Sequence, residues 1–191
     1  MLGRFQVWPL VELDDGEKSI PDWWLSYVWE QMHEEGRDVQ VFYTGGVKTT
    51  DDWLGFINNP HNFPVFVMDA KTKKPVMAAW LNNVGQGVAE GHFCALGKYR
   101  PGSGEMVINY WRSFTGDDGN SFLRVIYGVT PEPYTTVFKL LHILGFEQLG
   151  TIPGLCFLAY EKKRVGGVIS YLLLEETDHG KKRSGGDSQP V

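Results

Sequence analysis

The chain has 191 residues and a formal net charge of −5, with 42% hydrophobic, 21% charged and 14% aromatic residues. This length suits one domain with a sizeable core, and the acidic balance argues against a general nucleic-acid binder. No stretch approaches the roughly 20 apolar residues of a membrane-spanning helix, and the start, MLGRFQVWPL, is too short and polar for a signal peptide, so we expect a cytoplasmic protein with no membrane partner.

The first hundred residues predict a strand, helices and an antiparallel sheet. A first helix begins at Pro21-Asp22, because proline is tolerated in a first turn, and it ends at Gly36. Thr49-Thr50-Asp51-Asp52 caps a second, short helix. Three apolar runs with polar turns between them then predict antiparallel strands. In chain order we expect a strand at 4–11, a helix at 22–35, a strand at 39–43, a helix at 52–57, and strands at 63–68, 75–82 and 88–96.

The second half alternates helices and strands. A helical pattern of apolar residues begins near Met106, and Gly145 ends a second helix. We expect a helix at 105–114, a strand at 122–129, a helix at 134–144, and strands at 155–162 and 168–175. The polar residues that follow predict a disordered tail. The expected organisation is therefore one domain over residues 1–176 and a tail over 177–191.

Tryptophans are concentrated at the N-terminus. Four of the seven lie in the first thirty residues, namely Trp8, Trp23, Trp24 and Trp29. They could form a surface that stacks ligands or docks a partner. We favour packing of the first helix, because aromatic side chains most often fill cores.

The two cysteines, Cys94 and Cys156, lie in apolar runs without a CxxC neighbour or a histidine at metal-ligand spacing. This pattern predicts buried free thiols in a reducing compartment and no metal site. Asp117-Asp118 resembles a divalent metal pair, but an Asp-Asp-Gly-Asn loop is more often plain turn chemistry.

A glycine-containing loop, Gly97-Lys-Tyr-Arg-Pro-Gly-Ser-Gly104, joins the strand at 88–96 to the next helix. A helix N-terminus has about four unpaired backbone N–H groups and a positive dipole end. Glycines before it let the backbone approach an anion, which makes a phosphate site. The loop is no Walker A motif and lacks the GxGxxG spacing. A structural turn is the alternative explanation.

The element order and two motifs resemble the GCN5-related N-acetyltransferase (GNAT) superfamily. Its pyrophosphate loop is Gln/Arg-x-x-Gly-x-Gly/Ala, which matches Tyr99-Arg-Pro-Gly102-Ser-Gly104 except that Tyr99 replaces the leading residue. Its second landmark, a helix ending in Leu-Gly-Phe, is found at Leu144-Gly145-Phe146. The resemblance covers about residues 4–175, with an extra strand at 39–43. It implies an α/β (α+β) fold with a mixed, mostly antiparallel sheet of about seven strands and about four helices.

The resemblance also implies a function: transfer of an acetyl (acyl) group from acetyl-CoA, as co-substrate, to an amine acceptor in a direct ternary complex. The acceptor would be a small molecule or a protein amine; a homodimer is left open. By position, the residues that would bind acetyl-CoA are Phe93, Cys94, Ala95 and Leu96 for the pantetheine, Tyr99, Gly102, Ser103 and Gly104 for the pyrophosphate, and Lys98 or Arg100 for the adenosine phosphates.

Acetyl transfer requires a neutral amine, so a base is needed, and an acid should reprotonate the thiolate. Glu90 is our first candidate for the base and His92 the second, since side chains two apart on a strand share a face. A wet sheet surface would explain the same pair. The family's acid is a Tyr at the position of Leu141; Tyr134 or His142 are the candidates to replace it. The altered positions favour, as the alternative, a catalytically inactive GNAT-fold binding or assembly protein.

Overall fold

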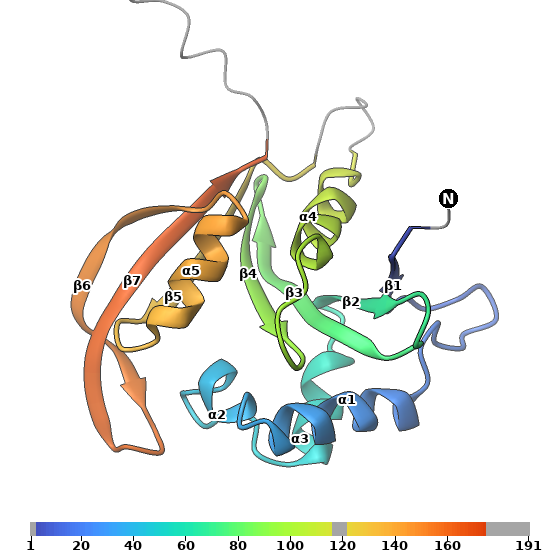
Figure 1. The fold of residues 1–191 in the computed structure, drawn as a ribbon, viewed down its shortest axis with the longest axis horizontal. Coiled ribbons are helices and arrows are strands. Elements are labelled where there is room, and N and C mark those ends of the chain that lie inside the picture. The colour runs from blue at the N-terminus through green and yellow to red at the C-terminus, as the bar shows by residue number, and fades with distance from the viewer. Residues whose placement is uncertain (1–2, 116–121, 175–191) are drawn as a thin grey trace, which may run out of the picture.

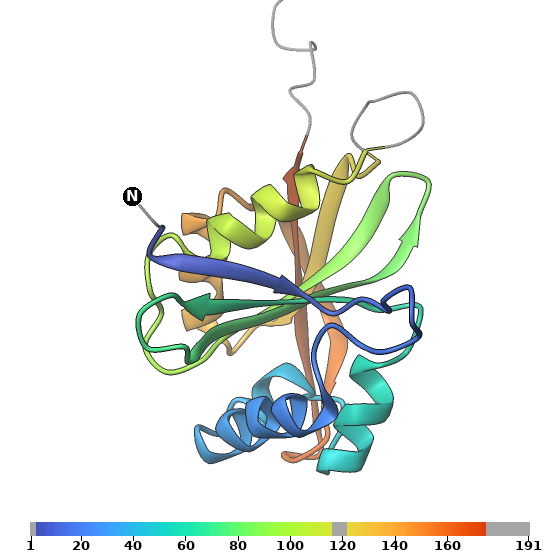
Figure 2. The ribbon, with the colours of Figure 1, turned by 90° about the vertical axis from the view of Figure 1, so that its right-hand side faces the viewer.

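The computed structural model describes residues 3–115 and 122–174, which form a seven-stranded sheet with helices on both faces (Figures 1 and 2). The strand order is β1-β2-β3-β4-β5-β7-β6, and every neighbouring pair is antiparallel except β4 and β5. The expected α/β fold is confirmed, with five helices instead of about four. The strands are β1 Phe5–Pro9, β2 Phe63–Asp69, β3 Pro75–Gly85, β4 Val88–Ala95, β5 Val125–Pro131, β6 Glu147–Leu158 and β7 Lys163–Leu173, and the helices are α1 Asp22–Glu34, α2 Asp38–Val41, α3 Thr50–Ile57, α4 Ser103–Arg112 and α5 Thr135–Ile143.

Two hydrophobic cores lie on opposite faces of the sheet, because successive side chains of a strand alternate between faces. In β2, Val65 and Val67 belong to the core beneath α4 and α5, whereas Phe66 and Met68 belong to the core beneath α1, α2 and α3. Figure 2 shows these two helical layers above and below the strands. Any ligand that enters the sheet between two strands therefore meets one layer on each side.

The N-terminal helices form where the sequence predicts them. A capping box begins α3: the Thr49 hydroxyl accepts a hydrogen bond from the Asp52 amide, and the Asp52 carboxylate accepts one from the Thr49 amide. In α1, Trp24 and Trp29 are buried, which confirms that these two tryptophans pack the helix. The same expectation is wrong for Trp23, whose side chain is 71% exposed.

The strand expected at 39–43 is wrong, because this segment contains α2 and the turn that follows it. A five-residue apolar run cannot distinguish a strand from a buried helical turn by periodicity alone. Burial decides the conformation: the Phe42 ring stacks on Trp80 with centroids 5.7 Å apart and also contacts Trp29 and Trp53. The helical turn places one side of this segment against the hydrophobic core that contains Trp80.

The last strands are longer or shifted relative to their predicted positions. The strand expected at 155–162 is the second part of β6, which begins at Glu147, and the one expected at 122–129 begins at Val125. Both cysteines are buried and free, as predicted. The expected tail at 177–191 and the Asp117-Asp118 pair lie outside the described residues. None of the helices in the described segments is long and apolar enough to cross a membrane.

Candidate functional site

The two parallel strands in the middle of the sheet separate after three residue pairs. The last pair joins Glu90 of β4 to Tyr127 of β5. Beyond it, β4 continues to pair with β3, and β5 continues to pair with β7. At the point of separation, a Cβ added to Gly128 would lie 3.2 Å from the carbonyl oxygen of Gly91. The strands thus form a V with unpaired facing edges.

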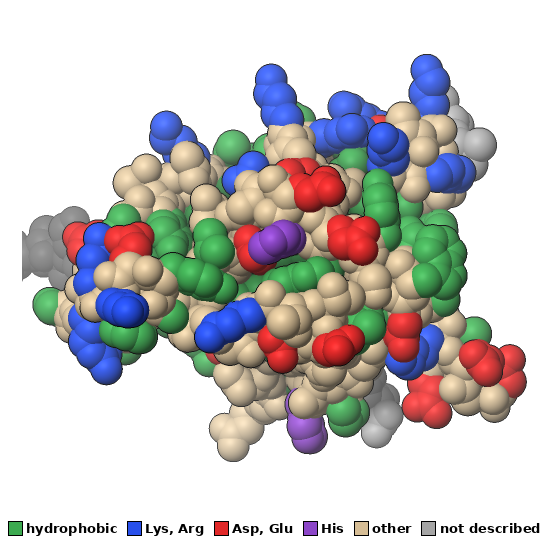
Figure 3. Space-filling view, turned by 90° about the horizontal axis from the view of Figure 1, so that it is seen from below, with side chains coloured by type: hydrophobic (Ala, Val, Ile, Leu, Met, Phe, Trp, Pro, Cys, Tyr) green, Lys and Arg blue, Asp and Glu red, His purple; other side chains and the backbone are tan. Residues whose placement is uncertain are grey.

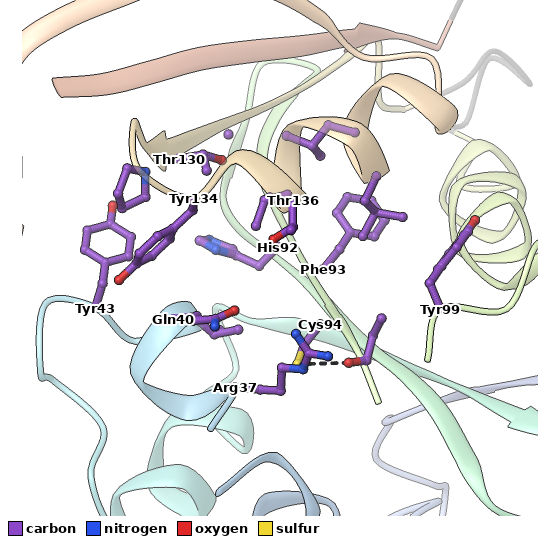
Figure 4. A pocket seen from close by; sticks show the side chains of 18 of the residues that line it. Arg37, Gln40, Tyr43, His92, Phe93, Cys94, Tyr99, Thr130, Tyr134 and Thr136 are labelled. Carbon is purple, nitrogen blue, oxygen red and sulfur yellow. Dashed lines mark hydrogen bonds between the residues drawn. The ribbon is translucent and has the colours of Figure 1, made fainter. Parts of the chain in front are cut away.

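A cavity of about 420 Å³ fills this V (Figure 4). It is lined from both helical layers, with α5 on one side and the α2 segment on the other. Its lining residues are Gly91, His92, Phe93, Cys94, Ala95, Gly97, Lys98 and Tyr99 of β4 and its loop, Gly128, Val129, Thr130 and Pro131 of β5, Tyr134, Thr136, Val137, Leu140, Leu141 and Phe146 of α5 and its flanks, and Arg37, Gln40, Val41 and Tyr43 around α2.

His92 is a titratable side chain of β4 that extends into the cavity (Figure 4). Its ring stacks on Trp80, with centroids 5.2 Å apart. Burial lowers the pKa of His92 below its ordinary value, and the nearby Glu90 carboxylate opposes this shift only in part. His92 is therefore neutral at pH 7. Its Nε2 lies 3.3 Å from Asn82 Oδ1, an acceptor, so the proton belongs on Nε2 and Nδ1 is free to accept.

Glu90, the first candidate for the base, does not line the cavity. Its carboxylate accepts a hydrogen bond of 2.8 Å from the Asn83 side chain, and its Oε1 lies 3.9 Å from His92 Nε2. The structure thus brings the two candidates together, but of the two only His92 lines the cavity. Glu90 lies where it can orient the His92 ring.

Tyr134 stands at the end of the cavity beyond His92, directly before α5. Its ring lies edge-on to Tyr43, with centroids 6.4 Å apart. Burial raises the pKa of Tyr134, and the charges of Glu161 and Cys156 add to the shift. Tyr134 therefore keeps its proton at neutral pH and can donate it. His142, the other candidate for the acid, lies on α5 but does not line the cavity.

Three polar cavity residues come from the α2 segment, where the sequence indicated no site. These are Arg37, Gln40 and Tyr43, and all three lie on the same side of the cavity in Figure 4. Tyr43 is held in place from two directions: its carbonyl accepts from the Ala159 amide at 2.8 Å, and the Cys156 thiol lies 3.7 Å from its hydroxyl. The wrong prediction of a strand at 39–43 covered Gln40 and Tyr43 and gave no reason to place either of them at a site.

The glycines of the loop before α4 have structural reasons of their own. Gly102 has a φ of 94°, a conformation that other residues rarely adopt. A Cβ on Gly104 would lie 2.5 Å from a methyl group of Leu144, so this glycine lets α4 pack closely against the end of α5. The Ser103 amide and hydroxyl both donate to the Arg100 carbonyl. None of the three residues lines the cavity.

Tyr99 and Glu105 meet at the N-terminus of α4. The Tyr99 hydroxyl donates to Glu105 Oε2 at 3.1 Å, and burial followed by this carboxylate raises the pKa of Tyr99 to about 12. The positive end of the α4 dipole thus already faces a carboxylate of its own first turn. An incoming phosphate would have to share this position with Glu105 or displace its side chain.

The other expected acetyl-CoA residues divide into two groups. Phe93, Cys94, Ala95 and Lys98 line the cavity, as does Tyr99. Leu96 does not: its side chain is 3% exposed and packs in the core beneath α1, α2 and α3. Arg100 is also occupied, since its guanidinium pairs with the carboxylate of Asp69, the last residue of β2.

The Cys94 thiol lines the cavity but is not poised to react. Burial raises the pKa of Cys94 to about 12, so the nucleophilic thiolate is absent at neutral pH. Among the described residues, no group of three or more His, Cys, Asp or Glu side chains is placed to hold a metal ion. The cavity therefore offers a neutral imidazole and protonated phenols as its acid–base groups.

The face seen from below in Figure 1 shows the surroundings of the helical layer formed by α1, α2 and α3. Acidic side chains lie around the middle of this face and also at its edges, where most of the basic side chains lie as well (Figure 3).

Comparison with solved structures gives matches across almost the whole chain. A mutant form of the spermidine N-acetyltransferase SpeG from Vibrio cholerae is 14% identical, with 90% of this chain and 94% of that chain covered and a TM-score of 0.62. A ribosomal-protein-S5-alanine acetyltransferase from Vibrio fischeri is 12% identical over 92% and 96% of the two chains, with a TM-score of 0.62. A GNAT-family acetyltransferase from Bacillus anthracis is 15% identical over 91% and 97%, also with a TM-score of 0.62.

At the level of sequence, no protein-family description and no curated protein matches the chain. The likeness lies in the fold, which is the fold of these acetyltransferases.

Proposed function

We propose that this chain, which has the GNAT fold, is an acyl-CoA-dependent N-acetyltransferase that acts by direct transfer in a ternary complex. The observation that carries the proposal is the cavity between the separated ends of β4 and β5, lined from both helical layers. A cofactor can enter such a V from one face of the sheet while an acceptor approaches from the other. We place this activity in one domain over residues 1–176.

The donor arm is assigned to β4. Past Glu90, the edge of β4 that faces β5 is unpaired, and an extended amide-containing chain can add to it as a further strand. Phe93 and Ala95 line this path, and Lys98 lies at its far end with a charge that suits a phosphate. The main chain of Gly102, Ser103 and Gly104 would hold the pyrophosphate once Tyr99 and Glu105 make room.

The acceptor must lose a proton before it attacks. A lysine-like amine with a pKa of about 10.4 is rarely neutral at pH 7.4, and this costs roughly 4 kcal/mol. We assign the base to neutral His92, oriented by Asn82 and Glu90. His92 Nδ1 takes one ammonium proton, the amine nitrogen bonds to the acyl carbon, and the carbon–sulfur bond breaks. The nitrogen loses its second proton to the Tyr134 oxygen as that phenol protonates the departing thiolate.

The departing thiolate needs a proton. Tyr134 keeps its proton at neutral pH and lies on the wall of the same cavity, so we assign it as the acid. Its position before α5 differs from the family position occupied here by Leu141, which lines the cavity as an apolar residue. The Tyr134 phenol thus reaches the cavity from the start of α5, and not from the position within the helix that Leu141 occupies.

The proposal is tested by isothermal titration with acetyl-CoA, followed by thiol release with a panel of amines. Thr136→Trp places an indole in the cavity from an exposed position of α5, and Thr135→Trp, next to it but outside the cavity, is the matched control. We expect binding by the wild type and the control and its loss in Thr136→Trp. Equal binding by the two variants would place acetyl-CoA elsewhere.

A second candidate function is a binding or assembly protein with the same fold and no catalysis. The observation that favours it is the Tyr99–Glu105 contact, which puts a carboxylate where a pyrophosphate would lie. It predicts no heat with acetyl-CoA at millimolar concentration. The amine acceptor, the cytoplasmic location and a homodimer remain predictions of the first proposal.

A further inference from the structure

A second hollow lies away from the cavity, beside the first half of α1. It has a volume of about 480 Å³ and is lined by residues of β1, β2, α1 and the β2–β3 turn. We call it the tryptophan groove; its lining residues are Trp8, Pro21, Trp23, Trp24, Tyr27, Met68, Lys73 and Lys74. The proposed acetyltransferase chemistry uses none of them.

The walls of the tryptophan groove are aromatic rings that the fold leaves exposed. Trp23 and Tyr27 are 71% and 40% exposed and lie four residues apart on one face of α1. Trp8 is 38% exposed and stands 6.0 Å from buried Trp24, measured between ring centroids. Clustered exposed aromatic side chains mark binding surfaces, because they bury a large apolar area on contact.

One rim of the groove is positively charged. Lys73 and Lys74 are adjacent in the β2–β3 turn, and the Lys73 ammonium donates to the Gln6 side chain at 3.2 Å. Within the described part of the chain, the Lys74 ammonium has no hydrogen-bond or ion-pair partner. Asp22 of α1, which lies between the groove residues Pro21 and Trp23 in the chain, is engaged with Lys18 and Asn58.

We propose that the tryptophan groove binds a planar aromatic anion, whose ring stacks between Trp8 and Trp23 while its carboxylate, sulfonate or phosphate faces Lys74. Three features select this class. The volume lies within the range of small-molecule sites, the walls present aromatic faces, and the rim lysines repel a cationic ligand and attract an anionic one. The inference is independent of acyl transfer.

The test uses 8-anilinonaphthalene-1-sulfonate as the probe and its uncharged analogue N-phenyl-1-naphthylamine as the comparison. The dissociation constants are measured by fluorescence titration of the full chain and of Trp23→Ala and Lys74→Gln. We expect Trp23→Ala to weaken sulfonate binding about five- to tenfold, the size of one aromatic contact. Lys74→Gln should weaken it about threefold at low salt and little at high salt.

Tyr160→Ala is the matched control, since Tyr160 is an exposed aromatic residue of the β6–β7 turn, outside the groove. It should bind both probes like the wild type, and the uncharged probe should not respond to Lys74→Gln. Indole N–H signals provide the second measurement: the Trp23 signal, assigned with Trp23→Phe, should shift on addition of the sulfonate. An unshifted Trp23 signal, or equal sulfonate affinity in Trp23→Ala, overturns the proposal.

Discussion

The two ends of the central cavity are built in opposite ways. Just beyond the α4 end, the sequence motif consists of main chain and glycine, and Gly102 and Gly104 also serve the fold. At the other end, the groups that can move protons are side chains from three separate segments: His92 of β4, Tyr134 before α5 and Tyr43 after α2. A local sequence motif therefore indicates the α4 end, whereas the side chains at the other end come together only when the chain folds.

The two ends also differ in the property that controls them, which is charge near α4 and burial around His92. Near α4, the Glu105 carboxylate lies at the positive end of the helix dipole, where its negative charge opposes the binding of an anion. Around His92, burial and the Trp80 stack keep the imidazole neutral. Substitutions at the two ends should accordingly change different measured quantities.

The largest effect is expected at His92. Replacing a general base lowers kcat about 10²- to 10⁴-fold, so His92→Gln should lose this factor while the Kd of acetyl-CoA stays within about twofold. Steady-state kinetics with a saturating amine and titration with acetyl-CoA measure the two quantities. Glu90→Gln should lose about tenfold or less; an equal loss in both variants would make Glu90 the base.

His92 also gives a pH dependence whose sign follows from burial. Its pKa in the folded chain is lower than the ordinary value near 6.5 of the unfolded chain, so protonation favours unfolding. The free energy of unfolding should be highest above about pH 6.5 and fall as the pH drops through the folded pKa. In His92→Gln the fall should be shallower, as urea denaturation at several pH values can show; parallel curves would refute the burial effect.

The next largest effect is expected on stability, from the close packing of α4 against the end of α5. Gly104→Ala puts a methyl group 2.5 Å from the Leu144 side chain, and overpacking of this kind lowers the free energy of unfolding by about 1–3 kcal/mol. Urea denaturation measures the change. Gly55→Ala in α3 is the control, because its Cβ meets nothing within 4 Å and alanine favours the helix by up to about 1 kcal/mol.

If Gly104→Ala proves as stable as the wild type, the glycine is not required for packing. Its presence would then be better explained by close approach of a phosphate to the backbone.

A smaller effect is expected from Glu105, the acidic residue at the N-terminus of α4. Glu105→Gln removes a negative charge from the first turn of α4 and should tighten acetyl-CoA binding about three- to fivefold at low ionic strength. Isothermal titration at two salt concentrations measures it. Tyr99→Phe keeps the carboxylate and loses only the hydroxyl contact, so it should tighten binding less. Weaker binding in Glu105→Gln would show that the carboxylate helps to form the site.

The sequence sufficed for the fold because its signals are local. Turn residues between apolar runs located β2, β3 and β4, and the Thr49–Asp52 capping box located α3. The α2 segment failed because a five-residue apolar run carries no resolvable period. Its helical form depends on Trp80, which lies about forty residues away along the chain.

The same limit applied to the candidate site. Phe93 and Lys98 could be placed from the strand and its loop, and both line the cavity. Leu96 was placed beside them, but it follows the last paired residue of β4 and turns into the core. Arg37 and Tyr43 carried no signal of their own, since they reach the cavity through the packing of α2 on the sheet.

The smallest effect is expected at Cys94, and it distinguishes direct transfer from a covalent route. The thiol faces the cavity, but burial raises its pKa to about 12, so it remains protonated and weakly nucleophilic. Cys94→Ala should therefore keep kcat within about twofold, and mass spectrometry of the wild type with acetyl-CoA alone should show no added acetyl group. An acetylated chain that loses the label in Cys94→Ala would mean that the cavity stabilises a thiolate once the donor is bound. Transfer would then proceed in two steps, and His92 would serve the cysteine before it serves the amine.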